Sequence, residues 1–426
     1  MDPLRFSEAL PHPGPGWARR FGLIFAGQGL SLVGSALTQF VLLWWITETT
    51  GSVAALSMAG LAALLPQALL GPLGGTLADR YSRRAIMIIA DSVSALCMAV
   101  LIYLFATEQV QMWQVYAMMF VRSSMQAFQA PAAAASTAML VPTDFLPRAA
   151  GLNQTLQGLM TVAAAPLGAL AISVLPLSAA LAIDLVTAVL GIVPLLFFRV
   201  PQLRIPPEQQ QGVWADFREG LALVWHHRGL RHLYLLLGVV VTVIMPTFTL
   251  TLLLVREHFG GGAGQVALME GLSGVGMLLG GLLVTALAPR RQVTALLLGL
   301  GLSCLTLSLT ALAPADAFWL AVLWWAVSGI TFAFGNAPIS ALLQITIPNQ
   351  LQGRVLSLLS TVMGLAAPVG LLIAGAFGEV IGVRGLFIGG GLLGALLCLL
   401  GFFSRSLRHL EAQAQEKQAP VAAPQR

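Results

Sequence analysis

The stretch GTLADRYSRR (75–84) places one acid and three arginines at the junction of two apolar runs, Val53–Ala78 and Ala85–Ala106. Each run exceeds the roughly 20 residues that a helix needs to cross the hydrocarbon core of a bilayer. The pattern predicts two transmembrane helices that meet at one membrane surface. The whole chain has the same character, because 57% of its 426 residues are hydrophobic and only 9% are charged. A water-soluble domain carries about a quarter charged residues, so we expect an integral membrane protein.

Ten further apolar runs have a similar length, which predicts an all-α membrane protein with twelve transmembrane helices. The first of them is too long for the roughly 7–15-residue core of a signal peptide, so we count it as a transmembrane helix. The ten runs are 21–46, 112–140, 151–174, 177–198, 233–255, 264–288, 293–313, 317–347, 355–377 and 385–403.

The distribution of basic residues predicts the orientation. With both termini in the cytoplasm, the cytoplasmic segments hold 19 of the 22 lysines and arginines. The outer loops then hold only Arg256 and Arg384, and Arg122 lies within a span. This asymmetry follows the positive-inside rule and fits an even number of crossings, so we expect a multi-pass protein with both termini cytoplasmic.

The runs form two groups of six around a polar connector. In the connector Trp214, Phe217, Leu221 and Val224 recur at helical spacing. This spacing predicts an amphipathic helix, which either lies on the inner membrane surface or serves only as a linker. We expect the end of the chain to be disordered. The predicted segments are an N-terminal cytoplasmic tail (1–20), a first six-helix bundle (21–199), the cytoplasmic connector (200–231), a second six-helix bundle (232–404) and a C-terminal cytoplasmic tail (405–426).

The two groups repeat a pattern of proline, glycine and arginine. The offset between matched positions drifts only from 207 to 202 residues. Duplicated halves on either side of a connector predict two pseudo-symmetric bundles that enclose a central cavity. We expect the repeated Pro and Gly positions of the fifth and eleventh helices, Pro166, Gly168, Pro368 and Gly370, to bend those helices. The matched positions are Ala130-Pro131, Pro142, Arg148 and 164–168 in the first half, and Ala337-Pro338, Pro348, Arg354 and 366–370 in the second.

The stretch 75–84 resembles the signature loop of the major facilitator superfamily, G-x-x-x-D-R-x-x-R-R. The resemblance implies that Gly75 permits close helix approach. It also implies that the charged residues latch one conformation of a transporter at its cytoplasmic side. A simpler interpretation is that the charges only set the topology. In the second half the loop 281–291 has Thr285 in place of the acid, which predicts a weaker latch there. We assign to the latch Gly75, Asp79, Arg80, Arg83, Arg84 and, through an ion pair with the loop, Asp91.

Further segments resemble the macrolide-efflux branch of the drug:proton antiporters. The resemblance implies export of lipophilic drugs across a bacterial plasma membrane, with the proton as coupling ion and no cofactor. Two departures stand out: the fifth helix reads Ala165-Pro166-Leu167-Gly168 where the antiporter motif has Gly-Pro and paired glycines, and the usual glycines after Arg122 are missing. The similar segments are 26–40, 47–60, 86–91, 120–128, 181–186 and 352–359.

Three ionisable residues within the spans are candidates for proton coupling. A charge at the centre of a membrane helix costs roughly 2.5–3.5 kcal/mol on insertion scales, so its presence needs a reason. Asp184 is the leading proton carrier, because a carboxyl group withdrawn from water binds a proton more readily and a nearby cation opposes this. Arg122 is the candidate for that cation, although a fixed structural ion pair is the alternative. Glu270, near an outer helix end, is the third candidate, and simple hydration is its alternative.

Polar residues within the spans are candidates for the substrate cavity, because broad-specificity sites combine apolar walls with a few polar groups. Hydrogen bonds between helices would explain the same residues equally well. The candidates are Gln28, Ser31, Ser35, Gln39, Gln126, Asn153 and Asn336.

Other classes of protein fit poorly. An ATP-driven pump needs a Walker A lysine, and the only lysine is Lys417 in the tail. Gly271-Leu272-Ser273-Gly274 resembles the motif of rhomboid proteases, but no histidine lies within a span to act as base, so we expect no enzyme. We expect no metal site and no nucleic-acid partner. The expected partners are membrane lipid and a lipophilic small-molecule substrate. We expect the chain to be a monomer. The runner-up function is export of a natural amphiphile such as a siderophore or lysophospholipid.

Overall fold

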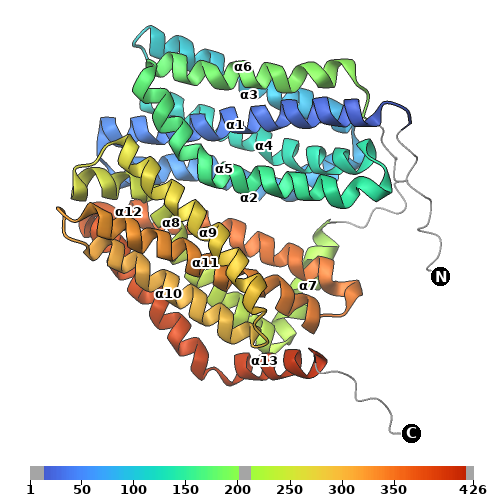
Figure 1. Cartoon of the computed structure of the whole chain (residues 1–426), viewed down its shortest axis with the longest axis vertical. Coiled ribbons are helices and arrows are strands. Elements are labelled where there is room, and N and C mark those ends of the chain that lie inside the picture. The colour runs from blue at the N-terminus through green and yellow to red at the C-terminus, as the bar shows by residue number, and fades with distance from the viewer. Residues whose placement is uncertain (1–13, 201–212, 419–426) are drawn as a thin grey trace. The chain divides into compact units, whose positions relative to one another are not determined.

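The computed structural model describes residues 14–200 and 213–418, and all regular structure within these ranges is helical (Figure 1). The helices are α1 (Trp17–Thr50), α2 (Val53–Arg80), α3 (Arg83–Ala106), α4 (Met112–Leu140), η2 (Thr143–Phe145), α5 (Leu146–Val174), α6 (Leu177–Phe197), α7 (Val213–His226), α8 (Arg228–Phe259), α9 (Ala263–Leu287), α10 (Gln292–Leu312), α11 (Phe318–Thr346), α12 (Asn349–Phe403) and α13 (Arg405–Gln418).

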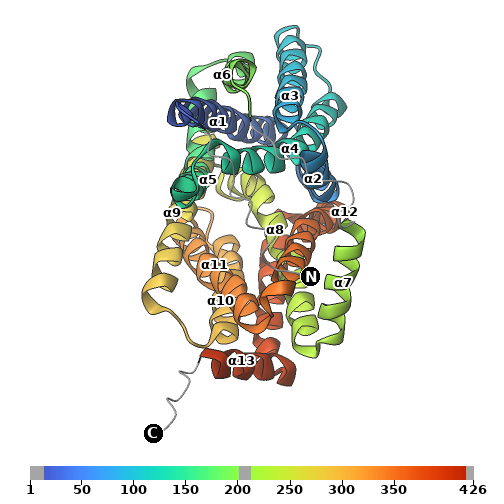
Figure 2. The same cartoon turned by 90° about the vertical axis from the view of Figure 1, so that its right-hand side faces the viewer.

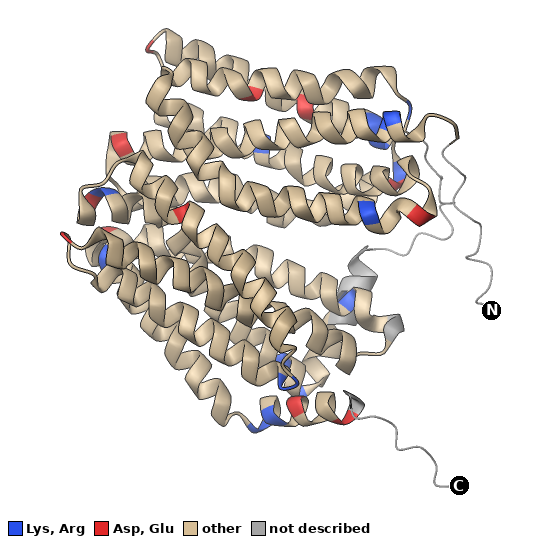
Figure 3. Ribbon diagram, in the orientation of Figure 1, with Lys and Arg blue, Asp and Glu red and all other residues tan. Residues whose placement is uncertain are grey.

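The predicted helical membrane fold is confirmed. Ten of the described helices are long and apolar enough to cross a membrane. α4 is not among these ten, since Arg122 and several Gln and Ser side chains reduce its apolar character. α12 runs over 55 residues but breaks at Gly382, whose φ of +76° is a backbone conformation that favours glycine. Its two parts contain the last two predicted spans. Charged residues lie mostly near helix ends, and few lie at mid-helix (Figure 3).

The chain divides into two compact units. The first comprises residues 1–42 and 65–210, and the second comprises residues 43–64 and 211–426. The division falls inside the predicted connector, but it also assigns the end of α1 and the start of α2 to the second unit. The predicted connector helix is present as α7, which packs on α8 and α12. Residues 1–13 of the N-terminal tail and residues 201–212 of the connector lie outside the described residues.

Small residues bring the helices of the first unit together. α3 packs against both α4 and α6. Gly27 and Gly34 of α1 lie so close to α6 that a Cβ atom on either would collide with it. At Gly74 of α2 the obstacle would be the carbonyl oxygen of Ala127 in α4. Close backbone approach at small residues is the usual way in which membrane helices pack.

The second unit repeats these pairings. α10 packs against α11 and α12, as α3 packs against α4 and α6. Gly276 and Gly280 of α9 abut α11, as Gly74 of α2 abuts α4. The matched glycines Gly168 and Gly370 also have equivalent neighbours, which are Phe40 of α1 and Thr242 of α8. Both glycines therefore serve helix packing, and the helix bends predicted at Pro166 and Pro368 stay a prediction.

The prediction of a disordered C-terminal tail is wrong for residues 405–418. These residues form α13, which lies across the end of the second unit (Figure 2). Leu407, Leu410 and Ala414 are buried at helical spacing, and α13 contacts α8, α10 and α11. Glu411 accepts hydrogen bonds from Thr294 N at 3.0 Å and from Thr294 Oγ1 at 2.9 Å. Apolar burial and this cap of α10 order a segment whose composition is polar.

Candidate functional site

A buried ion pair joins α4 and α6 in the first unit. Arg122 Nη2 lies 2.5 Å from Asp184 Oδ2, and the two side chains are only 11% and 4% exposed. A charge withdrawn from both water and lipid headgroups is stable only when another group compensates it. The predicted proton carrier, Asp184, and the predicted opposing cation, Arg122, are therefore direct partners. Proton coupling and a fixed structural ion pair both require this contact.

Ser35 of α1 connects to both members of the pair. Its Oγ donates to Asp184 Oδ1 at 3.1 Å and accepts from Arg122 Nη2 at 3.4 Å. The preceding residue, Gly34, lets α1 approach α6 closely enough for these contacts, because a Cβ atom there would collide with Thr187 and Asp184. We predicted Ser35 as a cavity residue, and the structure adds that it completes a triad with Arg122 and Asp184.

The signature loop forms a separate cluster at the ends of α2 and α3. Arg83 pairs with Asp79 at 3.4 Å and donates to the carbonyl oxygens of Ala78 and Ala135. Arg84 donates to the carbonyl oxygens at the end of α6, Leu195 at 2.5 Å and Leu196 at 2.8 Å. These bonds tie the loop to α4 and α6, and Arg80 lies in the same loop at the end of α2.

Two predictions for this loop are wrong. A Cβ atom on Gly75 would meet nothing within 4 Å, so Gly74 and not Gly75 makes the close helix approach. Asp91 does not pair with the loop but accepts a hydrogen bond from Gln28 Nε2 at 3.0 Å. Two helical turns separate Asp91 from Arg84, whose guanidinium is already bound to α6, so the distance along the helix keeps the charges apart.

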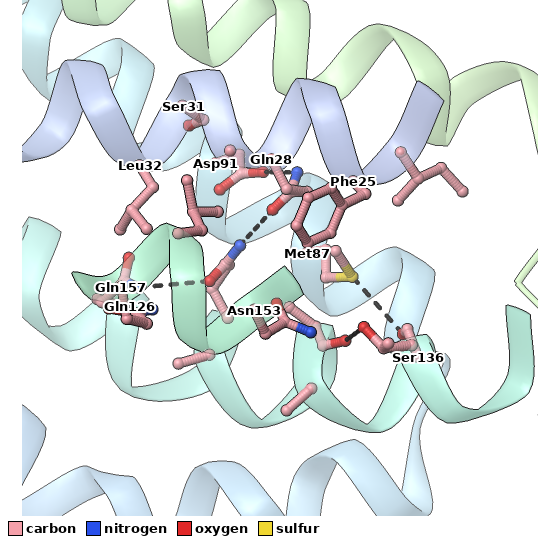
Figure 4. Close-up of a pocket in the computed structure, with 18 of the residues that line it drawn as sticks. Phe25, Gln28, Ser31, Leu32, Met87, Asp91, Gln126, Ser136, Asn153 and Gln157 are labelled. Atoms are coloured by element: carbon pink, nitrogen blue, oxygen red, sulfur yellow. Dashed lines mark hydrogen bonds between the residues drawn. The ribbon is translucent and has the colours of Figure 1, made fainter. Parts of the chain in front are cut away.

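A cavity of about 610 Å³ lies among α1, α3, α4, α5 and α6 of the first unit. Its walls combine aliphatic and aromatic side chains with hydroxyl and amide groups, as in sites that accept varied ligands. Of the predicted cavity residues, Gln28, Ser31, Gln126 and Asn153 line it (Figure 4), and so does Ser35. Gln39 does not line this cavity, and Asn336 lies in α11 of the second unit.

Several polar residues of the cavity wall are not among those predicted from the sequence. Gln129 follows Gln126 by three residues in α4, and Gln157 follows Asn153 by four residues in α5. Residues at these spacings share a helix face, so the spacing was the signal that could have found them. Asp91, predicted as a latch residue, also lines the cavity.

Amide groups form a hydrogen-bonded chain along one cavity wall. Gln126 Nε2 donates to Gln129 Oε1 at 3.5 Å, Gln129 Nε2 donates to Gln28 Oε1, and Gln28 Nε2 donates to Asp91 Oδ2 (Figure 4). Every donor in this chain points toward Asp91. The chain stabilises negative charge on that carboxylate but supplies no countercharge.

Glu270 lies in α9 of the second unit and is not among the residues that line this cavity. Its Oε1 atom is buried and has no hydrogen-bond partner within the described part of the chain. The residue as a whole is half-buried, so proton coupling and simple hydration both stay predictions for Glu270. Among the described residues, no group of three or more His, Cys, Asp or Glu side chains could hold a metal ion.

The chain is similar to known transport proteins along most of its length. The profile of the Major Facilitator Superfamily matches residues 24–355 and 234–425. Macrolide efflux protein A of Streptococcus pyogenes is 34% identical over 391 residues, which cover 90% of this chain and 95% of that protein. The multidrug efflux pump Tap of Mycolicibacterium fortuitum is 25% identical over 403 residues, which cover 89% and 94% of the two chains.

A solved structure shares the fold. A bacterial homologue of the human lysosomal transporter Spinster, described as inward-facing and unoccupied, matches with a TM-score of 0.69 at 16% identity. The match covers 96% of this chain and 99% of that one.

Proposed function

The chain belongs to the Major Facilitator Superfamily, and we propose that it exports lipophilic drugs, macrolide-like or other amphiphiles, in exchange for protons. The membrane would be a bacterial plasma membrane, with both termini in the cytoplasm, as the distribution of arginines favours. The similarity to macrolide and multidrug efflux proteins supports drugs as the substrate class. Transport would proceed by alternating access, the mode expected of duplicated helix bundles.

The observation that carries the proposal is the buried Arg122–Asp184 pair beside the cavity. Asp184 is both a partner of Arg122 and a residue of the cavity wall. A proton on Asp184 would neutralise the carboxylate and remove the attraction that holds the guanidinium of Arg122 at 2.5 Å. Arg122 would then be a buried charge without compensation, a state that favours rearrangement of α4 against α6.

Substrate and proton would thus act on one group of side chains. Ser35 donates to the charged form of Asp184 and lines the same cavity. A substrate that enters the cavity displaces water from around these groups and changes the free energy of protonating Asp184. A shared site provides coupling, since a ligand shifts an equilibrium by its differential affinity for the two states.

The proposal is tested by uptake of a labelled macrolide into inverted membrane vesicles that contain the full chain. An inside-acid pH gradient should drive accumulation, and a protonophore should abolish it. Vesicles without the chain provide the background. Accumulation that is unaffected by the protonophore would contradict proton coupling. The same assay with a labelled lysophospholipid tests the runner-up function, which predicts uptake of the lipid and not of the drug.

A further inference from the structure

Among the residues that the structure describes, the cavity of the first unit has one carboxylate, that of Asp91, without a countercharge. Of the described residues that line the cavity, only Asp91 and Asp184 are charged. Arg122 neutralises Asp184. Asp91 has Gln28 as its hydrogen-bond partner, and no ion pair involves it within residues 14–200 and 213–418.

The arginines of α3 and α4 are bound to groups other than Asp91. α3 itself carries two arginines at its beginning: Arg83 donates to a carbonyl oxygen of α4, and Arg84 donates to one at the end of α6. α4 and α6, the two helices that pack on α3, contribute Arg122 and Asp184, which form a pair. α1 contributes an amide, Gln28, at its point of contact with Asp91.

Asp91 is only 8% exposed, so its charge has little access to bulk water. A buried carboxylate without a countercharge is costly, and it is stabilised either by a proton or by a cation that arrives from outside. The directed amide chain from Gln126 to Gln28 favours the carboxylate form, because each amide donates toward it. The surroundings of Asp91 therefore favour a cation, and none of the described residues forms an ion pair with it.

The rest of the wall accommodates an apolar body around such a cation. Phe21 and Phe25 of α1 line the cavity, with ring centroids 5.4 Å apart. The face of an aromatic ring attracts a cation, and the ring also packs against apolar groups. Leu32, Leu156 and Met87 add aliphatic surface, and the volume of about 610 Å³ admits a drug-sized molecule.

We propose that Asp91 is a specificity-determining residue, which binds the protonated amine of an amphiphilic substrate held in this cavity. The inference rests on the proposed drug-export function and adds a preference that the function alone does not require. A neutral amphiphile of the same shape leaves the Asp91 carboxylate uncompensated and binds more weakly.

The test is equilibrium binding to the purified full chain of two labelled ligands, a basic macrolide and the neutral N-oxide of the same macrolide. At a pH where the amine is protonated, the wild-type chain should bind the amine at least about tenfold more tightly than the N-oxide. Asp91→Asn keeps the hydrogen bond from Gln28 and removes the charge, so it should erase this ratio by weakening only amine binding. Asp91→Glu should retain part of the ratio. Asp144→Asn, at an exposed acid of the same unit, should leave both affinities unchanged.

Each result bears on the inference in a distinguishable way. Equal binding of the two ligands by the wild-type chain, or a ratio that survives Asp91→Asn, would overturn the role of Asp91 and leave drug export standing. A wild-type chain that binds neither ligand would contradict the proposed function and this inference together. A folded Asp91→Asn variant is verified by its unchanged affinity for the N-oxide.

Discussion

Arg122 Nη2 and Asp184 Oδ2 lie 2.5 Å apart, on two helices that both pack against α3. The contact joins the middle of α4 to the middle of α6, where neither lipid nor bulk water can compensate a charge. Each residue thus determines whether the other can be charged. This mutual dependence distinguishes the pair from the exposed arginines near the helix ends, and it leads to the first prediction.

Replacement of either Arg122 or Asp184 alone should destabilise the fold more than replacement of both. Arg122→Ala or Asp184→Ala leaves one buried charge uncompensated, which typically costs about 3–5 kcal/mol of folding free energy. The double variant leaves no charge behind and should be more stable than either single variant. Thermal unfolding of the four proteins in detergent measures this coupling. Additive effects of the two substitutions would show that the ion pair does not form.

Loss of the Ser35 hydroxyl should weaken the pair without destroying it. Ser35→Ala removes one hydrogen bond to a charged carboxylate, worth about 1.5–3 kcal/mol. The midpoint of thermal unfolding should fall, and Ser35→Thr should restore part of it. Ser31→Ala is the matched control, because Ser31 lines the same cavity on the same helix. Equal effects at Ser31 and Ser35 would refute a specific bond to Asp184.

Two adjacent glycines of α2 should differ in their tolerance of a larger side chain. Gly74→Val places a side chain against the backbone of Ala127, whereas Gly75→Val meets no atom within 4 Å of its Cβ. Overpacking of a close helix contact typically costs about 1–3 kcal/mol. We therefore expect loss of folded protein for Gly74→Val and near-normal yield for Gly75→Val in size-exclusion profiles. A larger loss at Gly75 would mean that the signature glycine, and not its neighbour, makes the contact.

Glu411 should stabilise the second unit from α13. Its carboxylate takes the role at the start of α10 that Ser82 Oγ takes at the start of α3, where Ala85 N donates to it. Glu411→Ala should cost about 0.5–2 kcal/mol, the range for loss of an N-terminal cap. Thermal unfolding with Glu416→Ala, an exposed acid of the same helix, as the control measures the effect. Identical midpoints for the two variants would show that the cap carries no stability.

The helices were predictable from the sequence because bilayer thickness sets the length of an apolar run. The bounds of α4 match the predicted run 112–140. Its polar residues nevertheless keep it out of the ten helices that are apolar enough to cross a membrane, so hydropathy alone would miss it. α13 was missed because its composition is polar, while Leu407, Leu410 and Ala414 occupy one helical face. The sequence contains this spacing, but it does not show that the face packs against α8, α10 and α11.

The sequence shows which polar residues are buried in the membrane helices more readily than it shows which residues they contact. The isolated charges Arg122 and Asp184 were conspicuous in apolar helices, and their pairing needed only that α4 and α6 be neighbours. Asp91 was misassigned because the sequence shows Arg84 two turns away, whereas Gln28 is 63 residues away. Contacts between helices depend on their relative rotation, which local sequence does not encode.

The most direct measurement of proton coupling compares the wild-type chain with Asp184→Asn in proteoliposomes. Two properties are measured with a labelled macrolide: exchange for unlabelled drug without a gradient, and accumulation driven by a pH gradient. We predict that Asp184→Asn still exchanges labelled for unlabelled drug but no longer accumulates drug in response to a pH gradient. Asp144→Asn should behave as the wild-type chain does. Gradient-driven accumulation by Asp184→Asn at the wild-type level would contradict the role of Asp184 as the proton carrier.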